Sequence, residues 1–308
     1  MLEQAPARHV IAHISDTHLL GGTRKLFKRI DVADNLNVIL DRLRAGDQNV
    51  DALVFTGDLA DVAEPDAYRW IRRQVEPVAA ELGATVVWVM GNHDEREPYS
   101  RELFDDEGDG PQDRVYDVGG LRIISLDTTV TGYHHGAVTD AQLEWLSTEL
   151  STPAQHGTVL AMHHPPLIAH NPLVRLIGLD DDARLEPVLR GSDVRTILAG
   201  HLHYSSFGLF AGIPVSVASA TCYTVDLGAD KDLLLSAVDG AQSIQLVHLY
   251  DDNVVHTVVP VEAYDQIAGY PVALRAMAES MSDDEIREMI SSKTSDFNTA
   301  EREQSADL

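Results

Sequence analysis

The chain has 308 residues, 44% of them hydrophobic and 23% charged, values that are typical of a globular protein with a substantial core. Its formal net charge of -26 disfavours both the phosphate backbone of nucleic acids and anionic lipid surfaces, so we expect no extended nucleic acid as partner. The only cysteine, Cys222, excludes an intramolecular disulfide and a thiolate metal cage.

The amino-terminal segment lacks the basic and apolar regions of a signal peptide. No apolar run approaches the ~20 residues that a membrane-spanning helix needs. From these two observations we expect a cytoplasmic protein without a membrane span.

Apolar runs alternate with segments of helical periodicity in the first third of the chain. Strands are expected at 9–15, 52–57 and 85–91, because these runs are rich in β-branched residues and end at polar residues or glycine. Helices are expected between them at 32–45 and 64–82, where apolar residues recur at helical spacing. This order predicts an α/β fold with a parallel sheet flanked by helices.

The same alternation continues less regularly in the second half. Strands are expected at 121–128, 157–164 and 194–201, and a helix at 139–150 begins with a Thr or Asp cap. From residue 206 onward, short apolar segments and a turn at 251–253 predict an antiparallel sheet rich in hairpins.

No repeat and no linker divides this pattern. We expect one domain over residues 1–274 and a polar carboxy-terminal extension over 275–308. Within the extension, residues 281–290 predict a short amphipathic helix, and the last dozen residues are expected to be disordered.

Side chains of the kinds that bind metals follow five of the expected strands. In chain order they are Asp16 and His18; Asp58 and Asp61; Asn92, His93 and Asp94; His163 and His164; and His201 and His203. Any one of these groups has an ordinary structural explanation as a cap, a turn or a hydrogen-bonded core residue. Because ligands collect at the carboxyl ends of strands in α/β sheets, the five groups together predict a shared metal site.

The blocks D-x-H, G-D, G-N-H-D, H and G-H-x-H, spread over residues 9–260, resemble the signature of the calcineurin-like metallophosphoesterases. The stretches HISDTHL, VFTGDLAD and ILAGHLHYS resemble more closely the bacterial class III 3′,5′-cyclic nucleotide phosphodiesterases, especially the mycobacterial ones. This resemblance implies a four-layer α/β/β/α sandwich, a dinuclear metal centre and a homodimer.

The resemblance also implies a ligand set. Asp16, His18, Asp58 and His203 would hold one metal ion, and Asp58 would bridge to a second ion held also by Asn92, His163 and His201. Carboxylate, amide and imidazole ligands without a thiolate suit divalent or trivalent transition metals, Fe or Mn first and Zn or Co as alternatives. No tyrosine occupies a motif position, so the site does not resemble that of the purple acid phosphatases.

The remaining motif residues are expected to act around the metals. His93 follows a ligand, so its imidazole is free to contact the phosphate together with Asn92, or to protonate the leaving alcohol. The resemblance implies that Asp61 orients His93. Asp94 is expected to cap a helix or support its loop, and His164 is expected to lie behind the ligands.

Two clusters leave alternatives open. The basic residues Arg24, Lys25, Lys28 and Arg29 predict either a solvated surface loop or a patch that attracts an anionic substrate. His135, in the segment YHHG, is expected either to bind the substrate phosphate or to have a structural role in its loop.

The function expected from these residues and from the resemblance is hydrolysis of small phosphodiesters, with 3′,5′-cyclic AMP converted to 5′-AMP by a hydroxide that bridges two metal ions. A glycerophosphodiesterase or a broad-specificity phosphodiesterase would use the same centre. A non-catalytic scaffold is the third hypothesis, which the presence of all seven ligands disfavours.

Overall fold

The computed structural model describes residues 6–22, 24–262 and 280–299, together with positions 265, 267, 274 and 277. The chain divides into two compact units, one of residues 7–262 and the other of residues 1–6 with 263–308. All the predicted site residues belong to the first unit.

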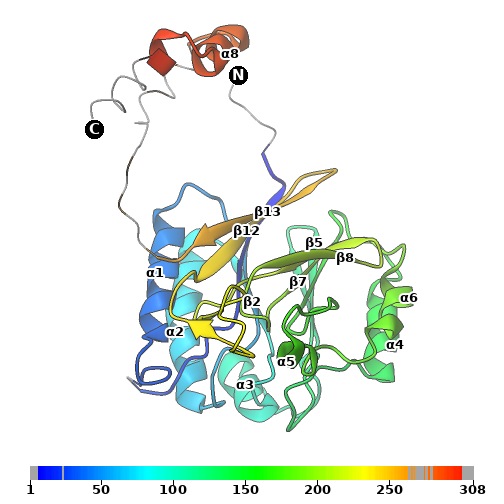
Figure 1. The fold of residues 1–308 in the computed structure, drawn as a ribbon. Helices are drawn as coiled ribbons and strands as arrows, with labels where there is room; N and C mark the ends of the chain where they lie inside the picture. The colour runs from blue at the N-terminus through cyan, green and yellow to red at the C-terminus, as the bar shows by residue number, and fades with distance from the viewer. Residues whose placement is uncertain are drawn as a thin grey trace. The chain divides into compact units, whose positions relative to one another are not determined.

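Two mixed sheets form the centre of this unit (Figure 1). The first has the order β13-β12-β1-β2-β3, and the adjacent strands β1, β2 and β3 are parallel. Its strands are β1 (His9–Ile14), β2 (Ala52–Thr56), β3 (Thr85–Val89), β12 (Ser243–Leu249) and β13 (Val254–Pro260). The three parallel strands confirm the elements predicted at the start of the chain.

The second sheet has the order β4-β5-β6-β7-β9-β8, in which β5, β6, β7 and β9 are parallel. Its strands are β4 (Arg114–Val118), β5 (Leu121–Leu126), β6 (Thr158–Met162), β7 (Val194–Ala199), β8 (Ser206–Phe210) and β9 (Ile213–Val217). The strands predicted at 121–128, 157–164 and 194–201 are β5, β6 and β7.

The expectation of one antiparallel sheet after residue 206 is wrong. The β8–β9 hairpin extends the second sheet, where β9 pairs in parallel with β7, whereas β12 and β13 extend the first sheet beside β1. Hairpins are local, but the edge that each one joins depends on contacts distant in sequence. A separate two-stranded ribbon is formed by β10 (Thr224–Val225) and β11 (Ala237–Val238).

Helices cover the outer face of each sheet. On the first sheet lie α1 (Val32–Ala45), α2 (Pro65–Leu82) and α3 (Arg96–Phe104), and on the second lie α4 (Asp140–Glu149), α5 (Pro172–Arg175) and α6 (Glu186–Leu189), preceded by the 3₁₀ turn η1 (Asp182–Arg184). Figure 1 shows α1 and α2 on one side of the sheets, with α4 and α6 on the other. The predicted cap of α4 is confirmed, because Thr139 and Gln142 form a capping box.

Three hydrophobic clusters define four layers. Leu36 of α1 and Ile71 of α2 pack with Phe55 of β2 in the outer cluster of the first sheet. Leu146 of α4 packs with Leu160 of β6 in the outer cluster of the second sheet. A third cluster lies between the sheets, with members such as Val54, Val87, Ile123, Val159 and Leu198. The predicted α/β/β/α sandwich is confirmed.

In the other unit, α8 (Asp283–Ser291) confirms the helix predicted at 281–290, and a capping box between Ser282 and Glu285 begins it. The disorder expected for the last dozen residues falls, from residue 300 onward, outside the described residues. Across the described ranges, no helix has both the length and the apolar composition that crossing a membrane requires.

Candidate metal centre

The carboxyl ends of β1, β2, β3, β6 and β7 bring all seven predicted ligands together. Asp58 is central, because its Oδ2 atom lies 3.4 Å from His18 Nε2 and 3.4 Å from His163 Nε2. Asp16 Oδ1 lies 3.3 Å from His203 Nε2 on one side. On the other side, Asn92 Oδ1 lies 3.1 Å from His163 Nε2.

The ligand atoms form two neighbouring groups. Asp16, His18, Asp58 and His203 offer atoms that all lie within 4.8 Å of one another, as do His163, His164 and His201. The first group consists of the four residues predicted to hold one metal ion. The second contains the predicted ligands His163 and His201 together with His164, which was not predicted as a ligand, and Asp58 lies close to His163 of this group. The arrangement can hold two cations joined through one carboxylate.

Three of the imidazoles are oriented by hydrogen bonds from the ring nitrogen that points away from the cluster. His163 Nδ1 donates to the Thr56 carbonyl at 2.7 Å, and His203 Nδ1 donates to the Tyr223 carbonyl at 3.2 Å. His18 Nδ1 lies 2.9 Å from Asp61 Oδ1. Because a donating Nδ1 leaves Nε2 as the free base, each ring presents a lone pair to the centre, as metal-binding histidines do.

His201 supplies a further test of whether a cation fits. Its Nε2 atom is buried and finds no hydrogen-bond partner in the described part of the chain. Burial, with the neighbouring His164 and His163, holds the pKa of His201 well below its usual range, so the ring is neutral. A buried, neutral, unpartnered imidazole nitrogen is costly unless it meets a cation or a donor, and the donor set therefore fits a metal.

The charges of the cluster are strongly coupled. Burial opposes a charge on His18, but hydrogen bonds with Asp58 and Asp61 outweigh it and raise the pKa of His18 to about 10. Burial likewise opposes a charge on His163, and the charge of Asp58 outweighs it and raises the pKa of His163 to about 9. Cations replace these protons when metal binds.

Five of the ligands have left-handed backbone conformations, which are uncommon in residues other than glycine. The φ angles of Asp16, His18, Asp58, His201 and His203 are 52°, 44°, 49°, 70° and 57°. Such conformations cost free energy and persist where the surrounding structure fixes them, commonly at functional sites. The strain coincides with the predicted ligands.

Two glycines let the strand ends approach one another. A Cβ atom on Gly91 would collide with the backbone nitrogen and the carboxylate of Asp58, and one on Gly200 would collide with the side chains of Ser15 and Asp16. The glycines of G-N-H-D and G-H-x-H are therefore required sterically, because no side chain fits between the converging loops.

His93 lies beside the first group of ligand atoms, which contains four predicted ligands without it. Its ring contacts that of His18, with centroids 4.7 Å apart. His93 Nδ1 donates to the carbonyl oxygen of Asp61 at 2.8 Å, whereas the Asp61 carboxylate is 3.8 Å from Nδ1. The contact of Asp61 with His93 is thus made by its backbone, and its carboxylate contacts His18 instead.

Asp94 and His164 have supporting positions. Asp94 accepts hydrogen bonds from the backbone nitrogens of Leu59, Ala60 and Gly91 and from the Tyr68 hydroxyl, which ties its own loop to the one that carries Asp58. Burial raises the pKa of Asp94 to about 6.

The ring of His164 is held between the Thr128 hydroxyl at 2.8 Å and the His134 carbonyl at 3.0 Å. Both nitrogens of His164 are thereby engaged. Its ring packs against His201, with centroids 4.5 Å apart, so His164 lies behind the ligands as expected.

Of the two histidines in YHHG, His134 is the one near the centre. Its Nδ1 lies 2.9 Å from Asn92 Nδ2, and its ring centroid is 5.1 Å from that of His93. His135 instead lies 3.6 Å from Asp180 and contacts the ring of Tyr133. The sequence showed that a histidine was available in this loop, but it gave no signal to choose between adjacent positions in an irregular segment.

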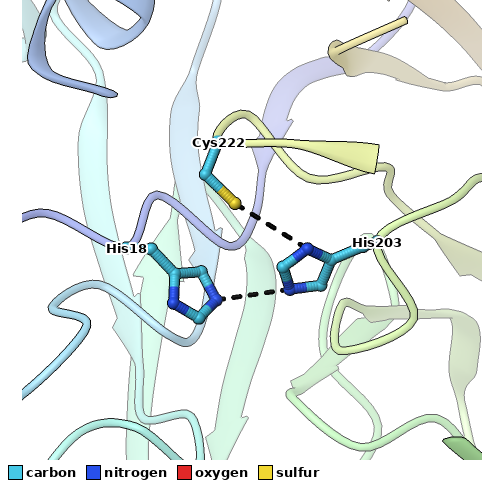
Figure 2. A group of neighbouring side chains, drawn as sticks. All are labelled: His18, His203 and Cys222. Atoms are coloured by element: carbon cyan, nitrogen blue, oxygen red, sulfur yellow. Dashed lines mark hydrogen bonds between the residues drawn. The ribbon is translucent and has the colours of Figure 1, made fainter. Parts of the chain in front are cut away.

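Cys222 also lies near the predicted ligands, with its sulfur close to the rings of both His18 and His203 (Figure 2). Its Sγ is 3.7 Å from His203 Nδ1, whereas His203 Nε2 is 3.2 Å from His18 Nε2. Burial raises the pKa of the Cys222 thiol well above its usual range, so it stays protonated. In the absence of a metal ion the thiol therefore packs in neutral form against the predicted ligand His203.

Comparison with known proteins supports the reading of the motifs. The model of the family "Calcineurin-like phosphoesterase" matches residues 9–205. The chain is 51% identical to the cAMP/cGMP dual specificity phosphodiesterase of Mycobacterium tuberculosis (strain CDC 1551 / Oshkosh), over 88% of this chain and 86% of that one. It is 49% identical to a probable cyclic nucleotide phosphodiesterase of Rhodococcus erythropolis, over 93% and 94% of the two chains.

Among solved structures, a purple acid phosphatase from yellow lupin seeds has a TM-score of 0.54 and 12% identity, covering 83% of this chain and 52% of that one. At this identity the similarity concerns the fold alone. It agrees with the four-layer sandwich described above.

Proposed function

Because the chain belongs to the calcineurin-like phosphoesterase family, we propose that it hydrolyses 3′,5′-cyclic nucleotides, with cyclic AMP converted to 5′-AMP. The observation that carries the proposal is the position of Asp58 between two groups of ligands. The 51% identity to a cAMP/cGMP phosphodiesterase supports the substrate class.

We propose that Asp16, His18, Asp58 and His203 hold one metal ion, and that Asp58, Asn92, His163 and His201 hold the second. Fe and Mn are the expected ions, with Zn or Co as alternatives, because the ligands are oxygen and imidazole nitrogen. When bound, a metal pair supplies Lewis acidity toward phosphoryl oxygens and lowers the pKa of water.

The residues of the chain itself have two further tasks. Asn92 Nδ2 donates to His134 Nδ1, which leaves the second Asn92 N–H and the Nε2–H of His134 to donate to a phosphoryl oxygen. His93, whose Nδ1–H donates to the Asp61 carbonyl, carries a second proton on Nε2 when it is the imidazolium, and it would pass that proton to the departing ribose oxygen. We propose His134 for the phosphate-binding role that the sequence had left open as one of two alternatives for His135.

A substrate comparison tests this function. We expect kcat/KM of the metal-loaded enzyme to be highest for 3′,5′-cyclic AMP or cyclic GMP, and lower for 2′,3′-cyclic AMP and for glycerophosphodiesters. Two transition-metal ions per chain should accompany activity. A preference for glycerophosphodiesters would favour the alternative enzyme, and full metal loading without turnover of any diester would favour the scaffold.

The oligomeric state and the cellular compartment can be tested in separate experiments. We propose a homodimer, which light scattering would contradict by giving the mass of a single chain. We also propose that the enzyme acts in the cytoplasm, where cyclic nucleotides are its substrate. Fractionation of cells should recover the activity with the cytoplasmic contents.

A further inference from the structure

A cavity of about 380 Å³ lies beside Tyr223, whose ring packs against that of the predicted ligand His203. Its walls include the apolar side chains of Phe27, Ile30, Tyr223 and Val238 and the charged side chains of Arg29 and Asp239. This volume falls in the usual range for small-molecule sites, roughly 300–1,000 Å³. None of these side chains has been given a role in the proposed reaction.

Tyr223 joins the cavity to the ligands. Its ring centroid is 4.5 Å from that of His203 and 6.2 Å from that of His18. The Tyr223 centroid is also 5.4 Å from that of Phe27. Because Tyr223 contacts both the cavity and two predicted ligands, a molecule whose phosphate lies at the metal centre can extend a neighbouring group toward this cavity.

Phe27 is held in an unusual position. Its side chain is 69% exposed, and its backbone has a φ of 51°, a left-handed conformation that is rare for a bulky residue. Leu26 and Ile30, on either side, are buried and anchor the turn through a hydrogen bond from Ile30 N to Leu26 O. Burial of Leu26 and Ile30 thus holds the Phe27 ring in solvent, although its left-handed backbone costs conformational free energy. Such an arrangement is typical of binding loops.

The charged wall of the cavity offers both kinds of hydrogen-bonding group. Arg29 Nε lies 3.7 Å from Asp239 Oδ2, and the two side chains are 79% and 36% exposed. Arg29 donates and Asp239 accepts. Purine edges carry acceptors and amino donors side by side, so an Arg–Asp pair can satisfy either adenine or guanine.

We propose that this cavity binds the purine base of the substrate, with the base stacked on Phe27 and its edge facing Arg29 and Asp239. The inference rests on the proposed function and names the part of the substrate that the metal centre does not contact. Stacking on an aromatic ring suits any base. The loop also carries Arg24, Lys25 and Lys28, but Arg24 pairs with Glu64 and Lys25 with Asp31, so these two charges are largely neutralised and the proposal does not depend on them.

Binding of two ligands that differ only in the base tests the proposal directly. Calorimetric titration of the metal-loaded protein should give tighter binding of 5′-AMP than of ribose 5-phosphate. Phe27→Ala should weaken 5′-AMP binding about 5- to 150-fold, the factor equivalent to losing one stacking contact. Ribose 5-phosphate should bind to the variant and to the unchanged protein equally well.

Two variants serve as controls. Phe27→Tyr keeps an aromatic face and should retain most of the preference for 5′-AMP. Phe207→Ala removes a ring that is 57% exposed and does not line the cavity, and it should leave both affinities unchanged. Equal binding of the two ligands by the unchanged protein, or equal losses for both in Phe27→Ala, would overturn the proposal.

Failure of the base-binding proposal can be distinguished from failure of the proposed function. In kinetic assays, Phe27→Ala should raise KM for cyclic AMP more than it lowers kcat, and it should leave turnover of the methyl riboside 3′,5′-cyclic phosphate, which has no base, within about twofold. If cyclic AMP were not hydrolysed at all, the proposed function would fail. A base preference that depends on Phe27 would still show in the titrations.

Discussion

The carboxylate of Asp61 lies 2.9 Å from His18 Nδ1 and 3.8 Å from His93 Nδ1, and the Asp61 carbonyl lies 2.8 Å from the same His93 nitrogen. One residue thus orients two histidines, a predicted metal ligand through its side chain and a predicted proton donor through its backbone. A substitution at this position separates the two roles, because only the side chain is lost.

We therefore expect Asp61→Ala to act mainly on the metal site. Loss of the hydrogen bond to His18 should weaken metal binding at that ligand about 10- to 100-fold, as is usual for groups that orient metal-binding histidines. The backbone contact to His93 should remain. Metal titration measures the first effect, with Asp66→Ala, at a carboxylate whose side chain is 69% exposed, as the control. Unchanged metal affinity would contradict the role assigned to the carboxylate.

His93→Ala should depend on the leaving group. A ribose alkoxide is a strong base and needs a proton as it departs, whereas p-nitrophenolate does not. General acid catalysis contributes typically ~10²–10⁴-fold, so activity on cyclic AMP should fall by about that factor and activity on bis(p-nitrophenyl) phosphate much less.

The metal content of His93→Ala should be unchanged, because the residue is not assigned as a ligand. Equal losses on both substrates would mean that His93 only stabilises charge on the phosphoryl oxygens. A loss of metal would mean that the ligand assignment is wrong.

Gly200→Ala tests the steric requirement at the centre. The added methyl group would overlap the side chains of Ser15 and Asp16, so the loop that carries His201 and His203 must move. We expect a loss of roughly 1–3 kcal/mol or more in the free energy of unfolding, together with weaker metal binding. Gly110→Ala is the matched control, because its Cβ would meet no atom within 4 Å. Similar denaturation curves for the two variants would refute the steric argument.

Some elements of the structure could be predicted from the sequence more readily than others. Buried parallel strands such as β1 and β2 and the motif residues at their ends were predictable, because both signals are local. The strand β4 was missed: its residues alternate in burial and form a hairpin with β5 across Gly119 and Gly120, but they lack a run of apolar residues.

The parts of the site that came from irregular segments were the least predictable. His134 rather than His135 lies beside Asn92, and the Asp61 carboxylate hydrogen-bonds His18 while it lies farther from His93. Phe27 and Tyr223 meet from segments almost two hundred residues apart. Spacing along the chain carries no information on such contacts, since they depend on how loops from both sheets pack.

His13 predicts a pH dependence of stability. It is fully buried in β1, and burial, followed by the nearby His256, lowers the pKa of His13 to about 3. Below the ordinary histidine pKa of about 6.5 the unfolded chain binds a proton that the folded chain does not, so the free energy of unfolding should fall as the pH drops from 6.5 toward 3. For this one group the slope is about 1.4 kcal/mol per pH unit.

Urea unfolding between pH 3 and pH 6.5 measures this dependence. The free energy of unfolding of His13→Gln should fall less steeply with decreasing pH than that of the unchanged protein, and the difference in slope should correspond to the uptake of about one proton. Exposed His170→Gln provides the control for removing a histidine. If His13→Gln does not fold, an NMR titration of the unchanged protein should find the His13 ring neutral down to about pH 4. A ring that gained its proton near pH 6.5 would contradict the argument.

Deletion of residues from 280 onward should leave the metal centre and diesterase activity intact. All seven predicted ligands, His93 and the cavity beside Tyr223 belong to the unit of residues 7–262, whereas α8 belongs to the other unit. The capping box of α8 is formed by its own Ser282 and Glu285, so it is removed together with the helix. We expect two metal ions per chain, kcat/KM within about twofold of the full chain and the same thermal midpoint. Aggregation or loss of the cooperative transition in the shortened protein would instead mean that the extension predicted at 275–308 is part of the folded core.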